Sequence, residues 1–203
     1  MKKILFFIAF ICTGSIFSQN DEAYVNQLTT DFTGKLKERG IPSYFSTKHY
    51  CSGTIEMFLI DGKMCTTRDT YYEVYLFWEE PDGTPFVKKI DNCGLYQSLE
   101  LPNNEVLYLA LENLYSIETE EVKPYKSETF TGTPELRKEV QPCFRSFEFS
   151  SLEDTVTKSF NLFDISNDSD GRNLNYEYNN ALNLVKVHKF TEEVLATLTF
   201  TRQ

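Results

Sequence analysis

The sequence predicts an α+β domain built around an antiparallel sheet. Three observations predict this class: apolar side chains recur every fourth residue near the start of the chain, a period of two dominates residues 52–91, and strand-like runs return towards the C-terminus. We expect one domain over residues 19–203, since about 185 residues are enough for one substantial core.

Residues 1–18 have the features of a secretory signal peptide. Two lysines precede an apolar run over residues 4–12, and the small Ser18 precedes a polar stretch. The run is far shorter than the roughly 20 residues that cross a bilayer, so we expect cleavage after Ser18 and no stable membrane insertion afterwards. The expected location is therefore outside the cytoplasm, either periplasmic or secreted.

The first expected element is an amphipathic helix that begins at Asn20 or Asp21, either of which can cap it, and ends before Gly40. Its apolar stripe consists of Tyr24, Leu28, Phe32 and Leu36. The opposite face carries too few cations for a membrane surface, so we expect the stripe to pack on the core.

Residues 52–91 predict an antiparallel β-meander. Apolar and polar side chains alternate from Ile55, and residues 70–79 form the run with the highest aromatic and β-branched content. Proline and glycine over residues 80–84 predict a tight turn. A three-residue loop there sets Trp78 beside Phe86 and Val74 beside Ile90.

The second half of the chain predicts one more helix and further strands. Helical spacing of apolar residues favours a helix near 104–115, and residues 118–142 have no sustained period and are expected to form a long loop. Strands are expected at the segments 143–149, 157–165 and 194–201. Residues 182–190 fit either a strand or a helix, and we favour the strand.

Four cysteines remain after the predicted signal peptide: Cys51, Cys65, Cys93 and Cys143. An even number in an oxidising compartment predicts disulfides, and four cysteines allow three pairings. Buried thiols that form no disulfide are the alternative. A zinc site is not indicated because the spacing fits no ligand pattern.

The net charge restricts the partners. The chain carries a formal charge of −10, which becomes −12 when Lys2 and Lys3 leave with the signal peptide. Nucleic acids and anionic membranes require clusters of Lys and Arg, and no such cluster is present in the sequence. We therefore exclude nucleic acid as a partner, and we ascribe the acidity to solubility.

The aromatic strand offers a candidate binding face. Alternation places Tyr72, Val74, Leu76 and Trp78 on one face, which resembles a core face. The other face presents Tyr71, Glu73, Tyr75 and Phe77. Three aromatic rings beside a carboxylate can stack on sugar rings or hold a peptide. A sheet face covered by a helix has the same composition, so both interpretations stand.

Residues 166–177 resemble the calcium loop of EF-hand proteins. Oxygen-bearing side chains occupy the first, third, fifth and twelfth positions, which are Ser166, Asp168, Asp170 and Glu177. Gly171 at the sixth position permits the sharp turn. The segment departs from the pattern at Ser166, where aspartate is usual, and at Asn173, where an apolar residue is usual. An Asx-rich surface turn is the alternative to calcium binding.

Signals for catalysis are sparse. His49 and Cys51 point the same way if they lie on an extended strand, so a thiolate and imidazole pair is conceivable. Glu73, Glu79 and Glu80 are the carboxylates nearest the aromatic strand, although nothing in their spacing selects a pair for glycoside hydrolysis.

These patterns favour an exported, non-enzymatic binding or interaction domain. Its expected partner is a protein, a peptide or a glycan, held by the second aromatic face or by the 118–142 loop. The alternative is a small extracytoplasmic hydrolase that uses carboxylates or the Cys–His pair. Calcium is the one cofactor that the sequence suggests.

Overall fold

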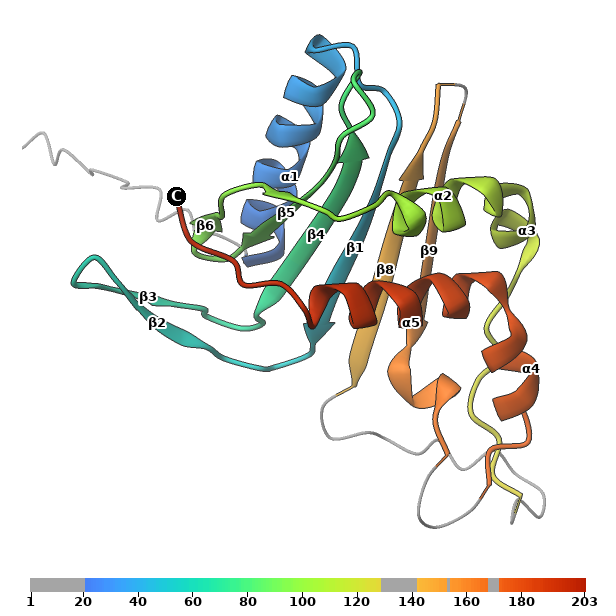
Figure 1. The fold of residues 1–203 in the computed structure, drawn as a ribbon. Coiled ribbons are helices and arrows are strands. Elements are labelled where there is room, and N and C mark those ends of the chain that lie inside the picture. The colour runs from blue at the N-terminus through green and yellow to red at the C-terminus, as the bar shows by residue number, and fades with distance from the viewer. Residues whose placement is uncertain (1–20, 129–141, 153, 168–171) are drawn as a thin grey trace, which may run out of the picture.

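The computed structural model describes residues 21–128, 142–152, 154–167 and 172–203. It confirms the α+β class: helices lie on both faces of an antiparallel sheet, and a second, smaller sheet projects from one side (Figure 1). The predicted signal peptide lies outside the described residues.

The main sheet has seven strands in the order β6-β5-β4-β1-β8-β9, with β7 paired to β5. The strands are β1 (Tyr44–Cys51), β4 (Tyr72–Glu79), β5 (Pro85–Asp91), β6 (Gly94–Leu95), β7 (Leu99–Glu100), β8 (Cys143–Ser150) and β9 (Thr155–Asn161). All neighbouring strands are antiparallel. The sequence reasoning had assigned no strand at β1, although β1 lies at the centre of the sheet.

The β4–β5 hairpin has the predicted register. Trp78 lies opposite Phe86 and Val74 lies opposite Ile90. The amide of Glu80 donates to the carbonyl of Thr84 (2.9 Å), which leaves a three-residue loop. Gly83 has a φ of 88° within this loop, a backbone conformation that only glycine adopts without strain.

The predicted meander begins later than expected. Strands β4, β5 and β6 follow one another across the main sheet, whereas β2 (Met57–Ile60) and β3 (Lys63–Thr66) form a separate two-stranded sheet. This hairpin, called the arm below, extends away from the main sheet (Figure 1). Period-two alternation identified the strands but could not assign them to a sheet.

Helix α1 (Asp21–Glu38) confirms the predicted N-terminal helix and covers one face of the sheet. Leu36 packs with Leu76 and Trp78, and Val25 packs with Val74 and other residues of β4 and β5. The helix therefore lies over β4, β5 and β6, beside one end of the sheet (Figure 1).

The other face carries the largest core cluster. Helices α2 (Glu105–Glu112), α3 (Leu114–Thr119) and α5 (Asn183–Leu195) lie over it (Figure 1). Phe45, Phe77 and Phe149 are fully buried beneath them, and their rings stack across neighbouring strands. Helices α2 and α3 occupy the segment where one helix was predicted, with a break at Asn113.

The prediction of strands over residues 182–190 and 194–201 is wrong. Residues 183–195 form α5, whose buried side chains Leu184, Val187, His188 and Thr191 recur at helical spacing. The chain then continues as a tail that joins the edge of the main sheet through an isolated bridge between Arg202 and Tyr96, a backbone hydrogen bond from Gln203 to Leu95 (3.0 Å) and the ion pair of Arg202 with Asp91. The β-branched content of the segment favoured a strand, but burial against the aromatic sheet face selects the helix.

The remaining predictions are partly confirmed. Strand β8 matches its expected position, and β9 starts earlier than predicted and ends in the 3-10 helix η1 (Leu162–Ile165). The described part of the predicted 118–142 loop is fixed to helix α4 (Tyr176–Ala181) by Asn179, whose amide bonds to the backbone of Lys123 at 2.8 and 2.9 Å. Residues 129–141 of that loop lie outside the described residues.

All four candidate cysteines form disulfides. Cys51 is bonded to Cys143 between the neighbouring strands β1 and β8, and Cys65 is bonded to Cys93, which ties the arm to the turn after β5. Two disulfides are typical of proteins that fold in an oxidising compartment. Over the described residues, no helix is long and apolar enough to span a membrane.

Candidate functional site

A cavity of about 390 Å³ opens where β1, β4 and β8 meet the C-terminal end of α5. It brings together three of the four predicted binding residues with both members of the predicted Cys–His pair. Its lining residues are His49, Tyr50, Cys51, Thr54, Tyr71, Glu73, Tyr75, Arg145, Glu192, Leu195 and Ala196. This space is called the arm-root cavity, because Thr54 leads directly into the arm.

The candidate binding face is divided by α5. Phe77 is 0% exposed and belongs to the core beneath the helices, so it does not line the cavity. Tyr71 and Glu73 lie further along the face, where α5 has ended, and both are half-buried. The interpretation that a helix covers this face therefore applies to Phe77. A binding role for Tyr71, Glu73 and Tyr75 stays a prediction.

Tyr71 is held by a buried carboxylate. Its hydroxyl donates to Asp91 Oδ2 (2.9 Å), which also accepts from the Tyr96 hydroxyl (2.8 Å). Arg202 donates to both oxygens of Asp91, at 2.9 and 2.7 Å, so the buried charge is paired. Burial, followed by the nearby Glu73 and Asp91 charges, raises the pKa of Tyr71, so this hydroxyl remains a hydrogen-bond donor at neutral pH.

Charged groups on the cavity wall are paired with one another. Arg145 Nε donates to Glu192 Oε1 (3.2 Å), and Lys89 forms an ion pair with Glu73. His49 Nε2 and His188 Nδ1 each lie 3.5 Å from the same Glu192 oxygen. His49 Nε2 also lies 3.0 Å from Thr47 Oγ1.

Both histidines are neutral at neutral pH. Burial, then the positive charge of Arg145, lowers the pKa of His49 well below its ordinary value and that of His188 to about 4. The negative charge of Glu192 favours the protonated forms of both histidines, but this carboxylate already forms an ion pair with Arg145.

The predicted Cys–His nucleophile is wrong. The Cys51 sulfur is bonded to Cys143 and has no thiolate to offer. The three carboxylates considered for hydrolysis all have partners: Glu73 pairs with Lys89, Glu79 accepts from Asn104, and Glu80 accepts from Arg39 and Trp78. Carboxylate chemistry remains an untested alternative.

The arm carries an exposed apolar face. Ile55, Met57, Leu59 and Met64 are 57%, 67%, 73% and 66% exposed. Met57 and Leu59 alternate along β2, and Met64 lies directly opposite Leu59 on β3, so these three side chains share one face. Ile55 precedes β2 by two residues and is exposed as well. The alternation of Ile55, Met57 and Leu59 is visible in the sequence, but it predicts a strand of the main meander and not a separate arm.

The opposite face of the arm is fixed to the body of the protein. The Phe58 ring lies 5.3 Å from the Tyr71 ring and 5.1 Å from the Arg202 guanidinium. Cys65 on the same face is bonded to Cys93. The arm is thereby held with its apolar face outwards.

The predicted calcium ligands fall partly outside the described residues. Asp168, Asp170 and Gly171 are not described, and Ser166 donates its hydroxyl to the carbonyl of Phe163 (2.9 Å). Glu177 is exposed and pairs with Arg172. No group of three or more His, Cys, Asp or Glu side chains within the described ranges could hold a metal ion. Calcium binding by this loop stays a prediction.

Comparisons with protein-family models, with curated proteins and with solved structures found no match to this chain. The surfaces of the chain itself are therefore the basis for inferring its function.

Proposed function

We propose that this chain is an exported, non-enzymatic interaction domain that binds a partner protein through the apolar face of the arm. The observation that carries the proposal is the exposure of Met57, Leu59 and Met64 on one side of a two-stranded sheet, with the exposed Ile55 directly before it. Soluble proteins rarely expose several large apolar side chains together unless the surface binds something.

The composition of the arm supports a protein partner. Two of its four apolar side chains are methionines, whose unbranched chains adapt to irregular partner surfaces. Residues 52–70 contain three acidic and two basic residues, so the net charge of the arm is −1, which is the average charge density of the chain. The apolar side chains, and not the charge of the arm, therefore provide the attraction for a partner.

The attachment of the arm also supports the proposal. The Cys65–Cys93 disulfide and the contacts of Phe58 hold the apolar face in place before binding. A pre-organised surface loses less conformational entropy on association, so it binds with higher affinity than a flexible surface of the same contact area. The arm-root cavity lies beside Thr54 and offers Tyr71, Glu73 and Tyr75 as polar contacts at the edge of the same interface.

Export is supported by two independent features. The first 18 residues have the pattern of a cleavable signal peptide, and all four later cysteines form disulfides. We expect a periplasmic or secreted protein that acts as a single domain over residues 19–203.

Site-specific crosslinking tests the interaction. A photoreactive amino acid is placed at Leu59, at Met64, and as a control at Leu152, which is 81% exposed and lies outside the arm. We expect positions 59 and 64 to capture the same protein in the exporting cells and position 152 not to capture it. Leu59→Asp should abolish the capture from position 64, and Leu152→Asp should leave it unchanged.

Two results would reject the proposal. One is that positions 59 and 64 capture no protein above the level at position 152. The other is that Leu59→Asp leaves capture from position 64 intact, because the apolar face would then contribute nothing to binding. Capture of a second copy of this chain would identify the partner as the protein itself.

A further inference from the structure

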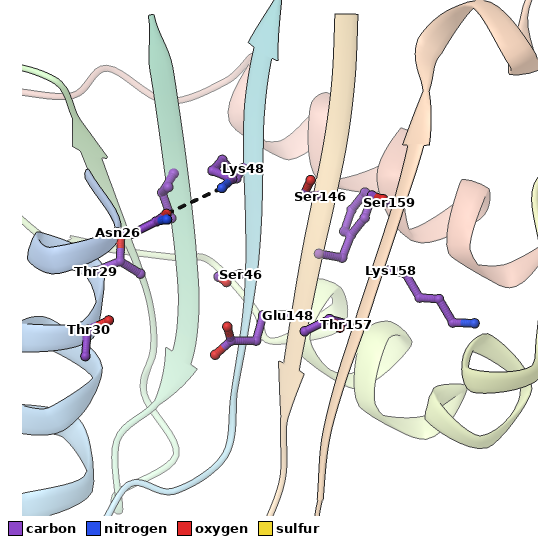
Figure 2. Close-up of a pocket in the computed structure, with 12 residues that line it drawn as sticks. Asn26, Thr29, Thr30, Ser46, Lys48, Ser146, Glu148, Thr157, Lys158 and Ser159 are labelled. Carbon is purple, nitrogen blue, oxygen red and sulfur yellow. Dashed lines mark hydrogen bonds between the residues drawn. The ribbon is translucent and has the colours of Figure 1, made fainter. Parts of the chain in front are cut away.

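The face of the sheet that carries α1 is only half covered. Helix α1 lies over β4 and β5, and no described helix covers β1, β8 and β9 on that side. A hollow of about 510 Å³ occupies this space, bounded by α1 along one side, and we call it the sheet groove (Figure 2). It lies on the opposite face of the sheet from α5 and involves no residue of the arm.

Hydroxyl groups dominate the lining of the sheet groove. They come from α1, β1, β8 and β9, as the labelled side chains in Figure 2 show. These residues are Thr29, Thr30, Ser46, Ser146, Thr157 and Ser159. The hydroxyls of Ser46, Thr157 and Ser159 form no hydrogen bond with any other residue that the structure describes. Each hydroxyl can donate one hydrogen bond and accept others, so the groove offers both functions to a ligand.

Strand register arranges these groups in rows across the sheet. Lys48, Ser146 and Ser159 lie opposite one another on β1, β8 and β9. Ser46, Glu148 and Thr157 form the next row, which is two residues away along each strand, or about 7 Å. The result is a regular grid of polar groups on a rigid sheet.

The charges in the groove disfavour an anionic ligand. Lys48 Nζ donates to Glu22 (2.6 Å) and is already paired, and it also donates to Asn26 Oδ1 on α1 (3.4 Å), the contact drawn as a dashed line in Figure 2. The ammonium of Lys158 donates to the backbone carbonyls of Glu118 and Glu120, at 2.6 and 3.0 Å, away from the other lining groups. No cation lining the groove is therefore left to bind a phosphate, a sulfate or a carboxylate.

The carboxylate in the groove suits a ligand with hydroxyl groups. Glu148 accepts one hydrogen bond from the Tyr44 hydroxyl (2.7 Å). Burial, then the Glu148 contact, raises the pKa of Tyr44 to about 12, so the tyrosine donates throughout the neutral range. Carboxylate oxygens accept several hydrogen bonds each, and the remaining capacity of Glu148 is available to hydroxyl donors.

Two aromatic residues lie one row beyond the lining of the groove at one end. Tyr50 and Phe144 lie opposite each other on β1 and β8, in the row next to Lys48 and Ser146. Their ring centroids are 5.3 Å apart, and both side chains are partly exposed. A sugar ring combines hydroxyl groups with apolar C–H faces, and aromatic side chains beside polar ones match both parts.

We propose that the sheet groove binds a neutral glycan. The hydroxyl groups of β8 and β9 and the carboxylate of Glu148 bind sugar hydroxyls, and Tyr50 and Phe144 contact the C–H faces of an adjacent ring. An extended peptide is disfavoured because its charged and apolar side chains would meet hydroxyl groups that offer neither complementary charge nor apolar area. This site is independent of the arm.

Titration by NMR tests the proposal. Purified protein with both disulfides formed is titrated with neutral hexasaccharides of glucose, mannose and N-acetylglucosamine. A galacturonic acid hexamer serves as the anionic probe, and a hexapeptide of alternating valine and lysine serves as the peptide probe. We expect at least one neutral hexasaccharide to shift the backbone amides of Phe144, Ser146, Thr157 and Ser159, and the anionic and peptide probes not to shift them.

Substitutions on β9 then test the lining groups. The double variant Thr157→Val with Ser159→Ala removes two hydroxyls from exposed positions and should weaken that binding about tenfold or more. Thr155→Val is the matched control, because Thr155 is exposed on the same strand but does not line the groove. The proposal is overturned if no neutral hexasaccharide shifts these amides, if the galacturonic acid hexamer or the peptide shifts them instead, or if Thr155→Val weakens binding as much as the double variant.

Discussion

Glu192 shows how single side chains organise the arm-root cavity. It lies within 3.5 Å of both histidines of the chain and accepts a hydrogen bond from Arg145. His188 Nδ1 is buried and has no hydrogen-bond partner among the described residues. A neutral imidazole tolerates this position, whereas protonation would place a second positive charge beside Arg145 in a buried site.

Stability should therefore depend on the protonation of His188. Its pKa is about 4 in the folded protein and about 6.5 in an unfolded chain, so the unfolded state binds more protons between these values. The stabilising contribution is complete above pH 6.5 and is lost as the pH falls towards 4, by about 3 kcal/mol. We expect the free energy of unfolding of His188→Gln, measured with urea, to fall over this pH range by about 3 kcal/mol less than that of the unaltered protein.

The exposed Glu193→Gln is the control for that measurement and should retain the full dependence on pH. An equal loss of stability in His188→Gln and in the unaltered protein would mean that other groups account for the acid sensitivity.

The sequence identified part of the arm-root cavity at the residue scale. Tyr71, Glu73 and Tyr75 were found because they lie on one strand, where alternation alone relates them. Arg145 and Glu192 come from β8 and α5, and their proximity to His49 depends on how distant segments pair. No local pattern encodes that proximity, so sequence reasoning missed both residues.

Helix α5 illustrates the same limit at the element scale. A helix usually begins with a residue that caps its first amides, but Leu182 at this position has no such group. The carboxylate of Glu120 accepts hydrogen bonds from the amides of Asn183 and Leu184 instead, both at 2.9 Å. The cap is more than sixty residues away in the sequence, so the start of α5 had no recognisable local signal.

Strand β1 was missed for a different reason. It packs between β4 and β8, yet it carries Ser46, Lys48 and His49, whose polar side chains leave no sustained apolar alternation to predict a strand. Its polar side chains are accommodated because one face borders the sheet groove and the other borders the arm-root cavity. The β4–β5 register, in contrast, was predicted correctly because a local turn determines it.

The two disulfides should stabilise different parts of the protein. Cys51–Cys143 spans 92 residues and Cys65–Cys93 spans 28. The loss of entropy that each disulfide imposes on the unfolded chain corresponds to a stabilisation of about 5 and about 4 kcal/mol, respectively. We expect C51A/C143A to lower the free energy of unfolding more than C65A/C93A. Only C65A/C93A should also accelerate amide hydrogen exchange in β2 and β3, since an isolated hairpin is marginally stable.

Urea unfolding and hydrogen exchange measure these two effects in the same pair of variants, and each variant serves as the control for the other. Unchanged exchange in the arm of C65A/C93A would indicate that the contacts of Phe58 are enough to hold it.

At the scale of the whole molecule, the two proposed sites use surfaces that the helices leave uncovered. Helix α5 ends before the last residues of the aromatic face, and α1 lies mainly over β4, β5 and β6. The arm and the sheet groove are therefore on opposite sides of the sheet and could be occupied together. The fold class was predictable because it follows from local periods, whereas these uncovered areas follow from helix lengths and packing.

The net charge gives the last prediction. A formal charge of −10 destabilises the compact state by repulsion, and raising the ionic strength from 0.01 M to about 0.15 M shortens the Debye length from ~30 Å to ~8 Å. Exposed ion pairs such as Arg39–Glu80 weaken in salt too, but each contributes at most about 1 kcal/mol. We expect repulsion to dominate, so that added sodium chloride raises the melting temperature at pH 7 by about 2–4 °C for each kcal/mol gained. The same series near pH 4.8, where the net charge approaches zero, is the control and should show no increase. A fall in melting temperature with salt at pH 7 would mean that attractive pairs outweigh the repulsion of the excess acidic residues.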